Sequence, residues 1–264
     1  MTWCVMRKVL RGLQAVIFCI LLWTGCSVKE NRRECPCRLF LDFSETDAEE
    51  VPYADLHVLS SEGFHLVEHV GSGAFVEELV LHVPRRGARV NAYCGAEGYV
   101  AEDGSMVIPY GSECPRVYMH SSYVETDCEA AFEKVRVRKN HCLITVHVEE
   151  ADFPYVLDVR GEVCGYGTDG RPAGGAFLFA MRPDDKGACS VSVPRQVDNS
   201  LRLDVDDGTD VLKTFALGEY VTASGYDWSA ESLDDITIGL DYSLSHVTLK
   251  IEGWEKELHF DVEI

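Results

Sequence analysis

Basic residues are scarce in this sequence. The 264 residues contain 24 Lys and Arg against 44 Asp and Glu, a formal net charge of −20 at pH 7. Residues 1–25 hold three basic residues and no acidic one, so the chain from residue 26 onward has 21 basic residues against 44 acidic ones, a net charge of −23. A surface of this sign repels nucleic acid and anionic lipid. The composition therefore argues against nucleic acid as a partner, and any membrane attachment should depend on acyl chains.

Catalytic signatures are also missing. The sequence has no HExxH metalloprotease motif, no GxSxG nucleophile elbow, no Walker phosphate loop and no dinucleotide-binding glycine pattern. It contains no CxxC pair of the kind that holds structural zinc. Neither a tandem repeat nor a low-complexity tract is present. We therefore expect a protein that is not an enzyme and that uses no cofactor and no metal ion.

Two groups of potential metal ligands are expected to bind no metal. His65 and His69 are four residues apart. On a strand they would share a face but lie too far apart for one tetrahedral ion, so an ordinary surface pair is expected. The acidic run 204–210 has the composition of a calcium loop, but an EF-hand loop starting at Asp204 needs glycine at position 209 and an acid at position 215. The sequence has threonine and phenylalanine there, which favours a solvated turn between strands.

The longest apolar run is too short for a spanning helix. Residues 15–23 carry no charge and follow a basic segment, which is typical of a signal peptide. The run ends at Gly25-Cys26, which resembles the bacterial lipoprotein site where a cysteine sulfur receives diacylglycerol and becomes the first residue after cleavage. The sequence thus predicts a signal peptide at 1–25, lipidation of Cys26 and a polar tether at 26–34. An ordinary secretory signal or an N-terminal membrane anchor is the alternative.

Short apolar segments separated by turn residues fill the rest of the chain. Many of them alternate in the period of a strand, and clusters of glycine, proline and aspartate lie between them. This spacing predicts an all-β fold of sandwiches. The predicted strands are 38–43, 55–59, 64–70, 77–83, 89–93, 117–123 and 143–148 in a first series, and 155–159, 177–181, 190–193, 201–205, 211–217, 236–242, 247–252 and 258–264 in a second.

The apolar pattern breaks at residues 149–154, where we expect a domain boundary. An N-terminal β-sandwich domain is predicted at 35–150 and a C-terminal one at 151–264. One short helix is predicted at 229–235, with Ser229 as its N-cap. Residues 243–246 are expected to form a hairpin turn, and the last strand should complete its own sheet.

The cysteines after residue 26 are even in number. They are Cys35, Cys37, Cys94, Cys114, Cys128, Cys142, Cys164 and Cys189. In an exported protein an even number permits disulfides, but a chain with this much apolar sequence does not need them to build a core. The sequence assigns no pairing.

Aromatic residues near the end of the chain allow two interpretations. They are Tyr220, Tyr226, Trp228, Tyr242 and Trp254. Exposed together on a flat face they would suit sugar stacking, which would make the protein a surface glycan-binding lipoprotein with a β-sandwich recognition module. Buried, they would be core and corner residues, which is the expected arrangement. We expect Trp228 in particular to be mostly buried.

Several short segments carry a resemblance to a known family. They are CPC at 35–37, GEVCGY at 161–166, LGEY at 217–220, SGYDW at 224–228, LDDI at 233–236, DY at 241–242 and Trp254. Together with a lipid-attachment cysteine they resemble the FimB-type fimbrial anchor lipoproteins of Bacteroidales, which are minor, fimbrillin-related anchoring subunits.

The resemblance implies two transthyretin-like β-sandwich domains in tandem. It implies a surface-exposed place in the cell outer membrane, at the base of a fimbrium, and a role in attachment and fibre length. The implied partners are the fimbrillin subunits of the shaft. Of the family's functional residues only Cys26 carries over, as the lipidation site, since the resemblance implies no enzymatic activity.

Overall fold

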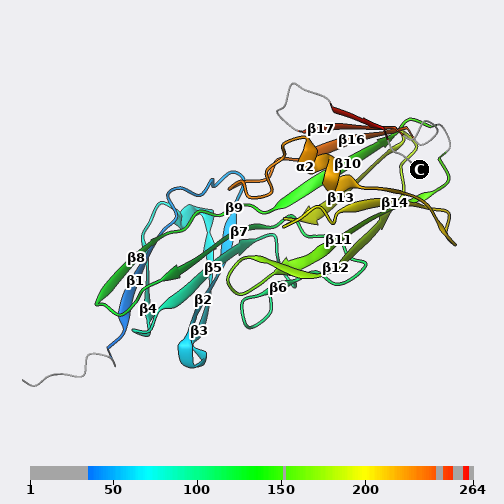
Figure 1. Ribbon diagram of the computed structural model, residues 1–264. Helices are drawn as coiled ribbons and strands as arrows, with labels where there is room; N and C mark the ends of the chain where they lie inside the picture. Colours follow the sequence, from blue (N-terminus) through cyan, green and yellow to red (C-terminus); the bar gives the residue numbers. More distant parts are fainter. Residues whose placement is uncertain (1–34, 151–152, 242–245, 252–257, 262–264) are drawn as a thin grey trace, which may run out of the picture. The chain divides into compact units, whose positions relative to one another are not determined.

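The computed structural model describes residues 35–150, 153–241, 246–251 and 258–261 (Figure 1). Its described strands form four sheets, with one short α-helix among the described residues. The predicted all-β fold of two β-sandwiches in tandem is confirmed. The described residues from Pro36 onward belong to one compact unit.

The first sandwich contains a three-stranded and a five-stranded sheet. Its elements are β1 (Cys37–Asp42), β2 (Tyr53–Ser60), η2 (Ser61–Gly63), β3 (His65–Gly71), η3 (Ser72–Ala74), β4 (Leu79–Val83), β5 (Ala88–Cys94), β7 (Tyr118–Val124), β8 (Ala130–Lys134) and β9 (Arg138–Lys139). The strand orders are β4-β1-β8 and β3-β2-β5-β7-β9. Within the smaller sheet, β1 pairs antiparallel with β4 and parallel with β8.

The second sandwich contains the remaining described elements. They are β6 (Met106–Val107), β10 (His141–Val148), β11 (Val156–Tyr166), β12 (Pro172–Met181), β13 (Ala188–Pro194), β14 (Arg202–Asp206), β15 (Val211–Phe215), α2 (Leu217–Ala223), β16 (Ile236–Asp241), β17 (His246–Ile251) and β18 (Leu258–Asp261). One sheet has the order β13-β10-β16-β17-β18, and the other has the order β12-β11-β14-β15, with β6 pairing to β11.

Each sandwich has its own apolar core, made by the inward side of alternating strands. Leu39 and Leu41 of β1 are fully buried in the first core, while Arg38 next to them points outward. Ile144 and Val146 do the same for β10 in the second core. The first core is completed mainly by β2 and β5, the second by β11, β14 and β16.

The strand β10 belongs to a different sandwich from the one expected. The sequence placed 143–148 at the end of the first series, but β10 pairs antiparallel with β13 and parallel with β16. Alternation shows that a segment is a strand with one buried face, and it does not show which sheet the strand joins. The predicted domain bounds 35–150 and 151–264 stay a prediction, although β10 pairs within the second sandwich.

The helix prediction was wrong in its position. Residues 229–235 form turns, bends and irregular chain, and the backbone N–H of Ser229 donates to Asp227 Oδ1 at 2.8 Å instead of starting a helix. The helix α2 occupies Leu217–Ala223. Its N-cap residue, Ala216, makes no side-chain cap, so the usual start signal is missing. The helix packs so closely against Asn199 that a Cβ at Gly218 would clash with the carbonyl oxygen of Asn199.

The C-terminal strand completes its own sheet over the part that is described. β18 pairs antiparallel with β17, with Val247 opposite Phe260. β16 and β17 are antiparallel neighbours, as a hairpin requires, but most of the predicted turn at 243–246 lies outside the described residues.

Candidate functional site

The predicted lipidation site lies outside the described residues. Cys26, the signal peptide 1–25 and the tether 26–34 all precede residue 35, where the description begins. Within the described part of the chain, no helix has the length and apolar character needed to cross a membrane. Acylation of Cys26 therefore stays a prediction. The first element after the tether is β1, which starts at Cys37.

Two of these aromatic residues, Tyr226 and Trp228, form a packed corner, as expected, and not the alternative sugar platform. Tyr226 is 7% exposed, and its hydroxyl donates a 2.7 Å hydrogen bond to the carbonyl of Asp234. Trp228 is half-buried against the second core and meets Tyr226 edge to face, with ring centroids 4.8 Å apart. Trp228 is thus less buried than predicted, but its ring still packs inward as a structural residue.

The other aromatic residues of that set do not supply a platform either. Tyr220 is half-buried on α2 and packs against the same core. Tyr242 and Trp254 lie outside the described residues. In the described part of this segment, therefore, no flat exposed aromatic face exists.

Arg195 fastens the corner, and sequence reasoning missed it. Its Nη1 donates to the carbonyl of Trp228 and, at 2.7 Å, to that of Ala230, while its Nε donates to Asn140 Oδ1 at 2.5 Å. The backbone N–H of Arg195 donates to the Tyr166 hydroxyl at 3.0 Å. Burial lowers the pKa of Arg195, because the charged form loses solvation. No local pattern announces such a residue, since its acceptors come from three distant parts of the chain.

The two histidines of β3 take separate partners. His65 Nε2 lies 3.2 Å from His57 Nδ1, with the rings stacked, and His69 Nδ1 lies 2.7 Å from Asp55 Oδ1. Burial lowers the pKa of His57, and the neighbouring His65 adds to this effect. Across the described residues, no group of three or more possible ligands is placed to hold a metal ion.

The acidic residues of 204–210 lie in two different environments, a buried position on β14 and the turn that follows this strand. Asp204 is buried, and it accepts from Arg160 Nε at 2.9 Å and from the Thr214 hydroxyl at 2.6 Å. Asp207 Oδ1 accepts from the backbone N–H groups of Thr209 and Asp210 at 2.8 and 3.0 Å. The turn that follows β14 is the turn between strands that the sequence predicted, whereas Asp204 is buried on β14 and is not part of it.

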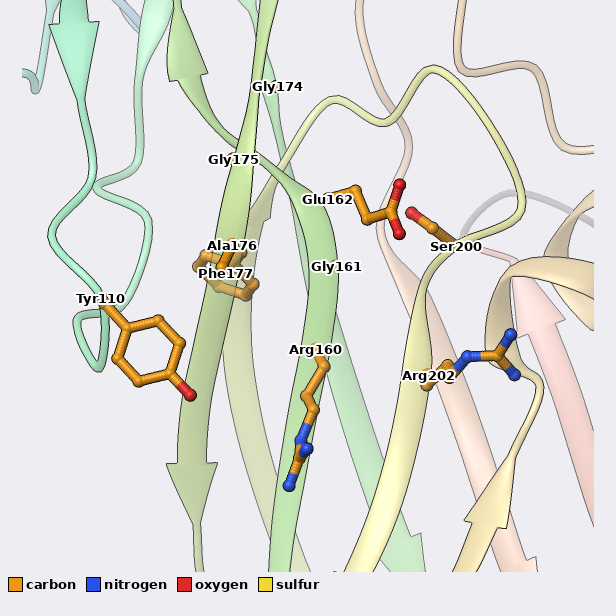
Figure 2. A pocket seen from close by; sticks show the side chains of 10 residues that line it. All are labelled: Tyr110, Arg160, Gly161, Glu162, Gly174, Gly175, Ala176, Phe177, Ser200 and Arg202. Atoms are coloured by element: carbon orange, nitrogen blue, oxygen red, sulfur yellow. The ribbon is translucent and has the colours of Figure 1, made fainter.

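An open groove lies where β11 and β12 lose their regular register. The register shifts after Gly161 and again after Val163, and a groove of about 640 Å³ is found there. Figure 2 shows the Glu162 carboxylate turned toward Ser200, while Arg202 points away from it. The lining of the groove lacks the histidine or cysteine on which most nucleophile–base pairs depend.

The outer face of the three-stranded sheet carries an exposed apolar row. The row consists of Val80 on β4, Phe40 on β1 and Phe132 on β8, which are register partners across the sheet. The rings of Phe40 and Phe132 are stacked with centroids 4.8 Å apart, and the guanidinium of Arg38 lies 5.8 Å from the Phe40 centroid. Phe132 is 68% exposed and Val80 is 41% exposed.

Charged side chains border this apolar row. Lys134 Nζ donates to Glu45 Oε1 at 2.7 Å, and Arg136 Nε donates to Glu45 Oε2. These two partners, Lys134 first, hold the pKa of Glu45 at about 2, well below its usual range. A polar rim around exposed apolar groups is the arrangement found at protein–protein contacts.

The same sheet has two strand edges without a described partner. In the order β4-β1-β8, β4 and β8 each pair with β1 alone. Unpaired N–H and C=O groups along such an edge can accept an additional strand. The three-stranded sheet therefore combines two open edges with an apolar outer face, and we take it as the candidate functional site.

Comparison with other proteins supports the fold. No protein-family model matches the chain, and no curated protein is similar to it in sequence. A candidate polysaccharide-binding protein from Bacteroides thetaiotaomicron matches with a TM-score of 0.59 and 13% identity over 86% of this chain and 98% of that one. A candidate adhesin from Bacteroides ovatus matches with a TM-score of 0.57 and 12% identity over 88% and 98%.

A fimbrial anchor protein is among the similar structures. Mfa2 from Porphyromonas gingivalis matches with a TM-score of 0.57 and 11% identity over 83% of this chain and 98% of that one. The predicted resemblance to fimbrial anchor proteins is thereby confirmed at the level of the fold.

Proposed function

We propose that this chain is a lipid-anchored protein of the outer-membrane surface that attaches a fimbrium to the cell and influences the length of the fibre. Cys26 carries the lipid, and the β-sandwiches contact the nearest fimbrillin subunit of the shaft. The protein catalyses no reaction and takes no cofactor.

One coincidence carries this proposal. A lipoprotein-type Gly25-Cys26 site precedes a chain whose fold is shared with a fimbrial anchor protein over 98% of the length of that protein. Several acyl chains on one cysteine give durable attachment where a single chain would be marginal.

The direction of strand exchange follows from the C-terminal strand. β18 is paired with β17 over Leu258–Asp261, so this part of the chain serves its own sheet. Strand pairing with a fimbrillin then needs an extended segment from the partner and an open edge on this chain. The three-stranded sheet supplies the edges β4 and β8, and its apolar row can receive alternate side chains of the added strand.

The direct test removes the lipid site. We expect Cys26→Ala to move the protein from the membrane fraction to the soluble fraction, with assembled fimbriae shed into the medium and altered in length. Electron microscopy of the cells, with a blot of the culture supernatant for fimbrillin, reports both effects. Cys35→Ala is the matched control, and it should leave attachment unchanged. Cell-attached fibres of normal number and length in the Cys26→Ala strain would sink the proposal.

A glycan-binding function is the second candidate. It is motivated by the similar structure from Bacteroides thetaiotaomicron, described as a candidate polysaccharide-binding protein. The burial of Tyr226 and the inward packing of Trp228 argue against glycan binding, since this function would need both rings exposed as a sugar platform. Binding of soluble polysaccharides by the purified chain, lost in Trp228→Ala while the fold is kept, would bring this function forward.

A further inference from the structure

Two thiols meet at the start of the candidate site. Cys37 is the first residue of β1, and Cys128 lies in the loop that leads into β8. Their sulfur atoms are 4.0 Å apart, although the two residues are 91 positions apart in the sequence. Within the described residues, no other two cysteine sulfurs are in hydrogen-bond contact.

The two backbone segments that carry the thiols are held side by side by the pairing of β1 with β8. β1 and β8 run parallel with Arg38 opposite Ala130, and the N–H of Arg38 donates to the carbonyl of Glu129 at 3.1 Å. Cys37 is fully buried, whereas Cys128 is exposed on its loop. A disulfide needs sulfur atoms about 2 Å apart. Because Cys128 lies on a loop outside both strands, we expect its side chain to close this gap while β1 and β8 keep their pairing.

We propose that Cys37 and Cys128 form a disulfide after export, which joins the beginning of β1 to the beginning of β8. The oxidant is a disulfide of a thiol–disulfide oxidoreductase outside the cytoplasm. The Cys128 thiolate attacks that disulfide, forms a mixed disulfide and releases one thiol. The Cys37 thiolate then attacks Cys128 Sγ and releases the second thiol. Two electrons and the two thiol protons pass to the oxidant.

The order of the two attacks follows from exposure. Cys128 is accessible to a large oxidant, and Cys37 is not. Burial also raises the pKa of Cys37, so little of this thiol is present as the reactive thiolate for the first attack. Once the mixed disulfide has formed, Cys37 has its target in contact, and the second attack is intramolecular.

The formation of this bond rests on export of the chain, and its mechanical role rests in addition on the proposed attachment of a fimbrium. A pull on a fimbrium held through Cys26 enters the fold at Cys37. Without the disulfide, that load falls on the backbone hydrogen bonds of β1, which has five register partners on β4 and five on β8. With it, the load passes through a covalent bond to Cys128. β1 is then protected against being drawn out of the sheet.

Peptide mapping of the full chain tests the pairing. Cells are treated with N-ethylmaleimide, and the protein is digested with trypsin without reduction. The expected product joins peptide 34–38 to peptide 117–134 and separates on reduction. It should survive in Cys35→Ser and in the control Cys164→Ser, and disappear in Cys128→Ser. Recovery of both peptides fully alkylated, or a joined product that needs Cys35 instead of Cys37, would overturn the proposal.

Two further readouts keep the result independent of fimbriae. The wild type should melt on the order of 5–10 °C above Cys128→Ser when oxidised and at the same temperature when reduced, because the bond closes a long loop. Equal melting temperatures under both conditions would contradict the cross-link. After shearing of whole cells, Cys128→Ser should shed more fimbriae than the wild type. If the wild type bears no fimbriae while the joined peptide is found, the proposed function fails and the disulfide stands.

Discussion

In the first sandwich, the apolar row on the three-stranded sheet is exposed to solvent. In the second sandwich, by contrast, the aromatic side chains of the corner at Tyr226 and Trp228 pack inward. Phe132 is 68% exposed, and Tyr226 is 7% exposed with its hydroxyl bonded to a carbonyl. Both arise from ordinary strands and turns in one compact unit. A contiguous exposed apolar patch can mark a site of contact with a partner. We therefore expect a partner contact at the apolar row of the first sandwich and a structural role for the corner of the second.

The polar residues of the two sandwiches also differ in how exposed they are. Beside the apolar row, Glu45 is bound by two exposed cations, Lys134 and Arg136. In the second sandwich, Arg195 is partly buried and donates to carbonyl and amide oxygens. Exposed ion pairs contribute little to folding, whereas acceptors left without a donor inside a protein are costly. Mutations should therefore affect stability in the second sandwich and attachment in the first.

The largest loss of stability is expected for Arg195→Ala. This change leaves the Asn140 side chain and the carbonyls of Trp228 and Ala230 without their donor. We expect the free energy of unfolding to fall by about 3 kcal/mol. Urea denaturation measures it. The matched control is Arg202→Ala on the exposed side of β14, which should change stability by less than about 0.5 kcal/mol. Equal losses of stability in the two variants would mean that the hydrogen bonds of Arg195 do not stabilise the corner.

A smaller loss is expected at Trp228. Trp228→Ala removes a half-buried ring and its edge contact with Tyr226. It should cost about 2 kcal/mol, less than a fully buried aromatic residue. Within the described structure, Trp228 Nε1 is buried without a hydrogen-bond partner. Trp228→Phe should therefore cost less than about 1 kcal/mol, since it loses no hydrogen bond. A Phe variant as unstable as the Ala variant would show that the indole N–H has a partner after all.

These residues mark the limit of what the sequence could predict. Most strands were found, because a strand with one buried face repeats every two residues. The sheet joined by β10 and the position of α2 depend on contacts that no local pattern contains. Arg195 depends on acceptors from three separate segments. Phe40 and Phe132 become neighbours only when β1 and β8 pair, so the apolar row could not be predicted from either strand alone.

Changes in the apolar row should spare stability and impair attachment. Phe132→Ala removes a stacked ring on an exposed face, at a cost of about 0.5–1 kcal/mol. If the three-stranded sheet contacts a fimbrillin, the variant should remain in the membrane fraction, as judged by cell fractionation, and should hold fewer fimbriae, as counted by electron microscopy.

The control for this change lies on another sheet of the same sandwich. Tyr123→Ala on β7 removes an aromatic side chain that is 55% exposed, and it should leave the number of fimbriae unchanged. Equal loss of fimbriae in both variants would mean that the apolar row is not the contact surface.

The smallest effect is expected from pH at the border of the apolar row. Lys134 and Arg136 hold the pKa of Glu45 at about 2 in the folded chain, below an unfolded value of about 4.3. A carboxyl group whose pKa is lower in the folded state stabilises the fold above the unfolded pKa, and this contribution is lost as pH falls toward the folded pKa. The wild type should therefore be slightly more stable than Glu45→Gln at pH 6, and the difference should disappear between about pH 4.3 and pH 2. Urea midpoints of the two proteins across this range measure the effect. Since Glu45 is half-exposed and both its partners are exposed, the difference should also shrink in high salt. A difference that persists at pH 2, or one that salt leaves unchanged, would mean that the Glu45 side chain acts through packing, and the contrast between an exposed ionic border and a buried polar corner would lose its basis.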